Sequence, residues 1–111
     1  MKQIPRKYLP DDMTVKSLNR ESEYGGEYLA PVEIKNVRFE RVENLNPNAY
    51  QLAEGASGRI WIDAVNSTGV FEVEKNSLVK VTRVEDEMIV LACMPYETTN
   101  GKIHHWELDV K

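Results

Sequence analysis

The sequence predicts an all-β fold: a small β-barrel, or a barrel-like sandwich, of about six strands with one long loop. Apolar residues recur at alternate positions in short runs, which is the period of half-buried strands and not of amphipathic helices. Turn-forming residues separate these runs along the chain. Closure into a barrel is favoured because it removes exposed strand edges. The chain has 111 residues and is expected to form one domain, residues 1–111.

The N-terminal segment, residues 1–12, is expected to be a flexible arm. Its bases Lys2, Arg6 and Lys7 make it locally basic. A short basic segment is typical of a solvated tail, and it is also typical of an arm that reaches a partner or a phosphate.

Two strand candidates follow, MTVKSL at residues 13–18 and VEIKNVRFERV at residues 32–42. In the second, the apolar face begins with Ile34 but resumes at Val37, so the inward phase slips by one residue near Asn36. A β-bulge at this point would restore the facing and would help the sheet to curl.

Residues 43–57, ENLNPNAYQLAEGAS, form the longest interruption and are expected to be a mobile loop. Asn46 could cap a helix, Pro47 suits its first position and Gly55 could end it, so about two helical turns are possible there. A helix of that length is marginal alone because nucleation is costly. We expect it to order only when something packs on it.

The second half of the chain contains the remaining strands. GRIWIDAV at residues 58–65 alternates cleanly, NSTG then forms a turn, and VFEVE at residues 70–74 is a short strand candidate. LVKVTRV is rich in β-branched residues. MIVLACM at residues 88–94 is apolar on both faces and is expected to be a covered central strand, ended by PYETTNG. Asn100-Gly101 indicates a hairpin back onto it.

Cys93 is the one cysteine, so no intrachain disulfide is possible. Inside its apolar strand it reads as a small hydrophobe, since a catalytic thiol needs a cationic and open setting.

The last strand, residues 102–110, contains two adjacent histidines, which a strand directs to opposite faces and which therefore cannot share one metal ion. Its predicted inward face carries His104, Trp106, Leu108 and Val110, and its outward face carries His105, Glu107 and Asp109. One histidine and two carboxylates could hold a metal in principle. A solvated or partner-facing surface is the preferred interpretation of that outward face.

Several function classes find no support in the sequence. The net charge of −4 gives no general attraction to nucleic acid or to an anionic membrane. No apolar run is long enough for a signal peptide or a membrane span. Phosphate-loop and zinc-ligand spacings are absent, and nothing completes a catalytic triad around a histidine. We therefore expect no enzyme activity, no cofactor and no metal.

Three features together resemble a known family. A strand reading VEIKNVRFERV leads into a long loop, GRIWIDAVNSTG follows, and a hairpin ends in GKIHHWELDVK. This order is similar to that of minor capsid proteins of tailed phages and prophages of Gram-positive bacteria, which are related in style to the head-tail connector (head-closure or stopper) proteins. The resemblance spans the chain from about residue 32 to its end.

The resemblance implies a non-catalytic virion subunit that assembles as a ring between the portal complex and the tail, with host cytoplasm as the site of assembly. Its partners would be portal, adaptor and tail proteins, and the isolated chain could be a monomer. The long loop would face the DNA channel, through Asn46, Pro47, Tyr50, Leu52 and Glu54. That loop has two acids and no base, which suits DNA that slides past without tight binding.

A different class also fits a small barrel. It is a binding module of the OB or SH3-like kind, for nucleic acid or a peptide. Tight, salt-sensitive DNA binding by the isolated protein would favour this module over the virion subunit.

Overall fold

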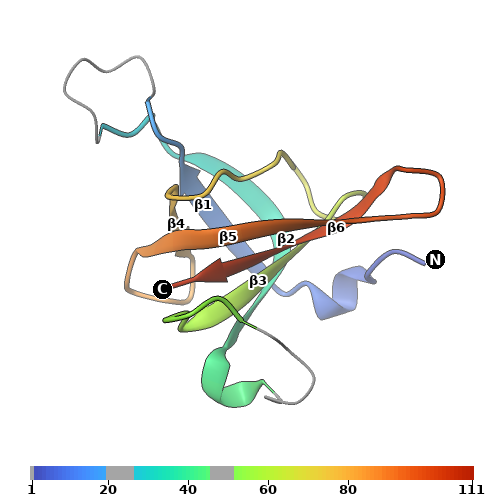
Figure 1. Ribbon diagram of the computed structural model, residues 1–111, viewed down its shortest axis with the longest axis horizontal. Coiled ribbons are helices and arrows are strands. Elements are labelled where there is room, and N and C mark those ends of the chain that lie inside the picture. The colour runs from blue at the N-terminus through green and yellow to red at the C-terminus, as the bar shows by residue number, and fades with distance from the viewer. Residues whose placement is uncertain (1, 20–26, 46–51) are drawn as a thin grey trace.

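The fold is a closed barrel of six antiparallel strands (Figure 1). The computed structural model describes residues 2–19, 27–45 and 52–111. Around the barrel the strands follow the order β1-β2-β3-β6-β5-β4. The strands are β1 (Asp11–Lys16), β2 (Val32–Arg41), β3 (Gly58–Asp63), β4 (Leu78–Val81), β5 (Met88–Glu97) and β6 (Ile103–Val110). Two short 3-10 helices, η1 (Arg6–Tyr8) and η2 (Val42–Asn44), complete the elements, and the all-β barrel prediction is confirmed.

The core lies inside the barrel and is built from alternate strand positions. Phe39 on β2 is its largest fully buried side chain. Trp106 on β6 is only 7 % exposed, and it pairs with Ile62 of β3 in the strand register. The other strand residues of the cluster are Met13, Val15, Ile34, Val37, Ile60, Val79, Val81, Met88, Val90, Leu108 and Val110, and Val73 and Val84 join it from the connections. The period of two that predicted strands is therefore the period of the buried apolar residues.

The phase slip in β2 is a β-bulge, as predicted. Asp11 pairs with Val37 while Asp12 pairs with Lys35, so Asn36 is left without a partner residue on β1. Its φ of 60° is the left-handed conformation that asparagine tolerates better than most residues. The Asp12 carboxylate accepts a hydrogen bond from the Asn36 amide at 3.1 Å, which satisfies the donor that the bulge frees.

Several strand predictions were wrong, and β1, β3 and β4 end earlier than their predicted runs, at Lys16, Asp63 and Val81. Residues 70–74 form no strand. β5 runs on through Pro95 to Glu97, beyond the predicted end at residue 94, because a proline is tolerated where one strand edge is open. Only one face of β5 is fully buried, and the side chains of Leu91 and Met94 are half-buried instead of covered.

The hairpin between β5 and β6 is confirmed. Gly101 has a φ of 78°, and Thr98 donates its amide to the Lys102 carbonyl at 2.7 Å. The two strands project together beyond the rest of the barrel, with the turn at their tip (Figure 1). No described residue belongs to a helix that is long and apolar enough to cross a membrane.

Candidate functional site

β6 alternates as predicted, but its polar face is not open to a partner. Glu107 is 8 % exposed and Asp109 is 1 % exposed, while His105 is half-buried. The expectation of a solvated face is therefore wrong for both carboxylates, which are buried in the isolated chain. The two carboxylates are buried because the neighbouring strand, β3, places a cation beside them on this face.

That cation is Arg59, itself only 4 % exposed. Its Nε and Nη2 donate to Asp109 Oδ1 and Oδ2 at 2.7 and 3.2 Å, and its Nη1 donates to Glu107 Oε1 at 2.8 Å. Burial by itself would lower the pKa of Arg59, but Asp109 and Glu107 outweigh it and raise the pKa. Three charged groups are thus removed from water together, each with charge-assisted hydrogen bonds.

Asp109 also fixes one end of the long loop. Its Oδ2 accepts a hydrogen bond from the Ala53 amide at 2.8 Å. Close by, Ser57 donates its amide to the Val110 carbonyl at 2.7 Å and accepts from the Val42 amide at 2.9 Å. The C-terminal end of the loop, residues 53–57, is therefore attached to β6 and to Val42, the first residue of η2.

The predicted loop residues are only partly described. Asn46, Pro47 and Tyr50 lie outside the described residues, as does most of the expected helix. Leu52 is half-buried, and Glu54 is exposed in a turn that continues into Gly55. Residues 52–55 are not helical, so the helix expected to end at Gly55 does not extend over them.

The two histidines bond to each other. Their Nδ1 atoms are 2.7 Å apart, although the side chains leave opposite faces of β6. On the outer side, His105 Nε2 lies 2.8 Å from Glu107 Oε2, and the Tyr96 ring stacks on the imidazole with centroids 4.8 Å apart. On the inner side, His104 Nε2 lies 2.6 Å from the Lys2 carbonyl oxygen. In the described part of the chain, no group of three metal-binding side chains has the geometry of a metal site.

The N-terminal arm is docked on the barrel around Asp63, which is fully buried. Gln3 donates to both carboxylate oxygens at 3.1 Å, and the Ile4 amide donates to Oδ1 at 2.8 Å. The Val65 and Asn66 amides donate to Oδ2 at 3.0 and 2.7 Å. Burial would raise the pKa of Asp63, but these hydrogen bonds outweigh it and lower the pKa.

The predicted basic residues of the arm keep their side chains exposed. Arg6 Nε donates to the Asn66 carbonyl at 3.2 Å, and Lys7 Nζ lies 5.1 Å from the centroid of the Tyr8 ring. The arm is bonded to the barrel and not free, and its last predicted residues, 11 and 12, already belong to β1. The arm expected over residues 1–12 therefore ends at residue 10, and its described part, residues 2–10, is docked on the barrel.

Arm, strand and loop are connected, which the sequence did not predict. A continuous series of hydrogen bonds runs from Lys2 through His104, His105, Glu107, Arg59 and Asp109 to Ala53. Asp63, which holds the arm, and Arg59, within the series, each carried a signal that sequence reading missed. Asp63 precedes a turn and accepts the amides two and three residues on, which is the typical bonding of an Asx turn. Arg59 occupies an outward position of an alternating strand, where an opposite charge on the next strand is favourable.

Cys93 is half-buried at the margin of the core. Burial, with a smaller contribution from the charge of Glu72, raises the pKa of its thiol to about 11. A thiol of this kind is protonated and unreactive at neutral pH.

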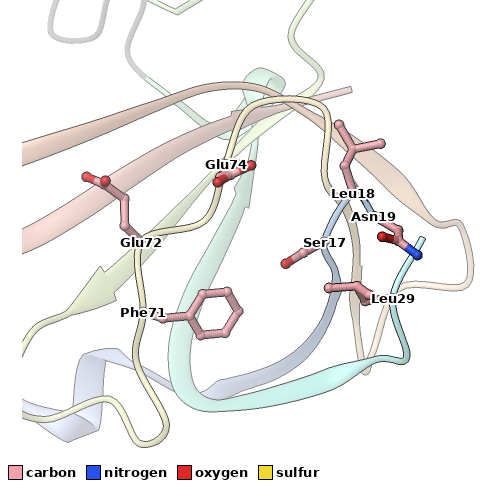
Figure 2. Close-up of a pocket in the computed structure, with 7 residues that line it drawn as sticks. All are labelled: Ser17, Leu18, Asn19, Leu29, Phe71, Glu72 and Glu74. Carbon is pink, nitrogen blue, oxygen red and sulfur yellow. The ribbon is translucent and has the colours of Figure 1, made fainter. Parts of the chain in front are cut away.

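A hollow of about 480 Å³ lies at the C-terminal end of β1, next to residues 17–19. Figure 2 shows Phe71, Glu72 and Glu74 on one side of it and the residues that follow β1 on the other. Its lining includes Leu18 and Leu29 and contains no histidine, cysteine or basic residue. Its polar groups are the carboxylates of Glu72 and Glu74, the Ser17 hydroxyl and the Asn19 amide.

Comparison with known proteins gives one match. A family model described as "Minor capsid protein" matches residues 5–110 of the chain. Neither a curated protein nor a solved structure matches the chain significantly.

Proposed function

The chain belongs to the minor capsid protein family, and from this premise we propose that it is a head-tail connector subunit that forms a ring between the portal complex and the tail. Membership alone gives it a structural, non-enzymatic role in the virion and contacts with other virion proteins. The position at the neck, the ring, and the portal, adaptor and tail partners are the further steps of the proposal.

The attachment of the long loop is the observation that supports this proposal most. A loop that enters a ring's channel must be held at its base while its tip adapts to its surroundings. Here the base is held by the Ala53 amide on Asp109 and by the Ser57 bonds to Val42 and Val110. Asp109 is held in turn by Arg59, so the anchor is part of the barrel itself.

The charge of the loop agrees with a channel position. Its two charged residues, Glu43 and Glu54, are both acidic and both exposed. Acidic groups repel phosphate, and a loop of this kind would let DNA slide past without holding it. The net charge of −4 means that the chain as a whole would also repel DNA.

A ring requires heterologous contacts that close on themselves. The docked arm offers one such surface, because Lys2, Arg6 and Lys7 point their charges into solvent at one end of the barrel. We propose that these bases meet an acidic surface of a neighbouring subunit. The subunit would be a monomer in host cytoplasm and would assemble only on the phage head.

Replacing residues 46–51 with a short glycine-serine linker tests the proposal. The described anchor, from Leu52 to Ser57, stays in place, so the purified variant should keep the stability of the natural protein. A phage that depends on the variant should fill its heads with DNA yet fail to join them to tails, which electron microscopy of the lysate would show.

A matched control replaces residues 85–87, an exposed turn far from the loop in sequence, with the same linker. It should leave the yield of infectious particles unchanged. Normal yield from the residues 46–51 variant would contradict the channel role of the loop. Empty or misshapen heads would contradict the connector position, because they place the defect before DNA packaging.

A further inference from the structure

The pair His104 and His105 lies between the N-terminal arm and the buried charges of β6. We propose that this pair is a proton-operated clasp, which adds its hydrogen bond to the docking of the arm only while the two rings together hold three protons. The inference rests on hydrogen-bond geometry and does not depend on where the protein sits in the virion.

The proton count follows from the partners of the two rings. The Lys2 carbonyl only accepts, so the His104 Nε2 that lies 2.6 Å from it must carry a proton. Glu107 is ion-paired with Arg59 and also accepts, so the His105 Nε2 at 2.8 Å must carry one too. The Nδ1 atoms, 2.7 Å apart, form a hydrogen bond only with a single proton between them. Two neutral imidazoles hold two protons, so the pair holds one more and has a charge of one.

The surroundings favour this single charge. On β6 the pair faces the Glu107 carboxylate, and on β3 Asp63 is the register partner of His105. From β5, Tyr96 stacks on His105, and Glu97 follows it along the strand. The nearby cations do not oppose this charge, because each is either bonded to carboxylates or exposed to solvent.

The nearest cation on β3 is Arg59, and its guanidinium is bonded to Glu107 and Asp109. The arm contributes the backbone carbonyl of Lys2, whose ammonium group is exposed. A single positive charge is thus placed among carboxylates in a half-buried site, where opposite charges stabilise one another.

Loss of the third proton breaks one of the three bonds. Two acceptor atoms would then face each other at about hydrogen-bond distance, which is repulsive. The rings are held in β6 by the strand ladder, while Lys2 precedes the first element of the fold. The contact between His104 and the arm is therefore the one that opens as the pH rises.

Gain of a fourth proton opens the clasp as well. Both Nδ1 atoms would carry hydrogens that point at each other, and two like charges would lie side by side. The rings must then separate, and His104 loses its alignment with the Lys2 carbonyl. The hydrogen bonds that Asp63 accepts lower the pKa of its carboxyl group below the ordinary value. Docking of the arm is therefore strongest while the pair holds three protons.

Nuclear magnetic resonance of the full chain tests the clasp from about pH 4 to about pH 9, the range that brackets histidine titration. The readout is the protection of the Ile4 amide against hydrogen exchange, corrected for the intrinsic effect of pH. We expect a maximum with a fall of about fivefold or more on each side, as the loss of one hydrogen bond of about 1 kcal/mol gives. The imidazole nitrogen shifts should show one proton shared by the two Nδ1 atoms.

Two variants sharpen the test. His105→Gln cannot share the proton, so Ile4 protection should lose its maximum. Lys7→Gln keeps every bond of the clasp and should retain the natural profile. Leu108 protection in the same spectra reports whether β6 stays folded. A flat Ile4 profile in the natural protein, or two histidines that titrate independently, would overturn the proposal, whatever the virion experiments show.

Discussion

Arg59 and Asp109 lie opposite each other on β3 and β6 and are joined by two hydrogen bonds, Nε to Oδ1 at 2.7 Å and Nη2 to Oδ2 at 3.2 Å. Both side chains are almost fully buried. The pair joins the barrel wall to the base of the long loop, since Asp109 also accepts the Ala53 amide. The closing strand of the barrel and the anchor of the loop are therefore one structure.

Arg59→Met should lower the free energy of unfolding by about 3 to 5 kcal/mol, because it leaves the buried Asp109 carboxylate without a cation and takes the Arg59 charge away from Glu107. Chemical denaturation measures this. Adding Glu107→Gln and Asp109→Asn to the same chain should recover a large part of the loss, since the uncompensated charges are then gone. If the free energy of unfolding of Arg59→Met alone lies within about 1 kcal/mol of the natural value, the carboxylates must reach water.

Asp63→Asn should release the arm. The amide group would present hydrogens to the Gln3 and Ile4 donors that now bond the carboxylate. Trypsin should then cleave after Arg6 and Lys7 at least about tenfold faster, because a hydrogen bond to a charged group contributes about 1.5 to 3 kcal/mol. Asp86→Asn changes an exposed carboxylate and serves as the control. Equal cleavage of the two variants would contradict the role of Asp63.

The same carboxylate gives a pH dependence with a defined sign. Its folded pKa lies below the ordinary value, so its stabilisation is complete above the ordinary carboxyl range. It is lost as the pH falls through the depressed folded value. Denaturation measured at a series of acidic pH values should show this loss in the natural protein, and a smaller loss in Asp63→Asn.

Asn36→Val should destabilise the barrel by about 1 to 2 kcal/mol, because a β-branched side chain is strained at a φ of 60°. Asn36→Gly should stay close to the natural stability, since glycine adopts that conformation freely. Lys35→Val, one residue earlier in the same strand, is the control. Equal thermal stability of the valine and glycine variants would mean that the bulge moves to another residue.

Cys93 should react with iodoacetamide about 100-fold more slowly near neutral pH than an ordinary thiol, because its pKa is raised to about 11 from 9.0 and the thiolate is the nucleophile. Mass spectrometry follows the labelling. The unfolded protein should react at the ordinary rate, and the Cys93→Ala chain should not react there. Fast labelling of the folded protein would contradict the buried setting of the thiol.

Features that depend on local sequence were predictable. The bulge at Asn36 follows from a slip in the apolar pattern, and the hairpin follows from Asn100-Gly101. The opposite facing of His104 and His105 follows from strand geometry alone. Each needs no more than a few neighbouring residues, and each is found in the structure.

Features that depend on distant pairing were not predictable. Glu107 reads as exposed along its own strand, and its burial requires knowing that β3 supplies Arg59 next to it. The docking of the arm likewise depends on Asp63, which is about 60 residues away from Gln3 along the chain. Alternation tells which side chains share a face, but the cover over that face comes from the tertiary fold.

The position of the protein in the virion tests the central claim most directly. Cryo-electron microscopy of virions carrying a small tag at the exposed turn of residues 85–87 would locate each copy. A ring of tag density at the junction of head and tail is the expected result. Tag density spread over the capsid shell, or confined to the far end of the tail, would contradict the connector role.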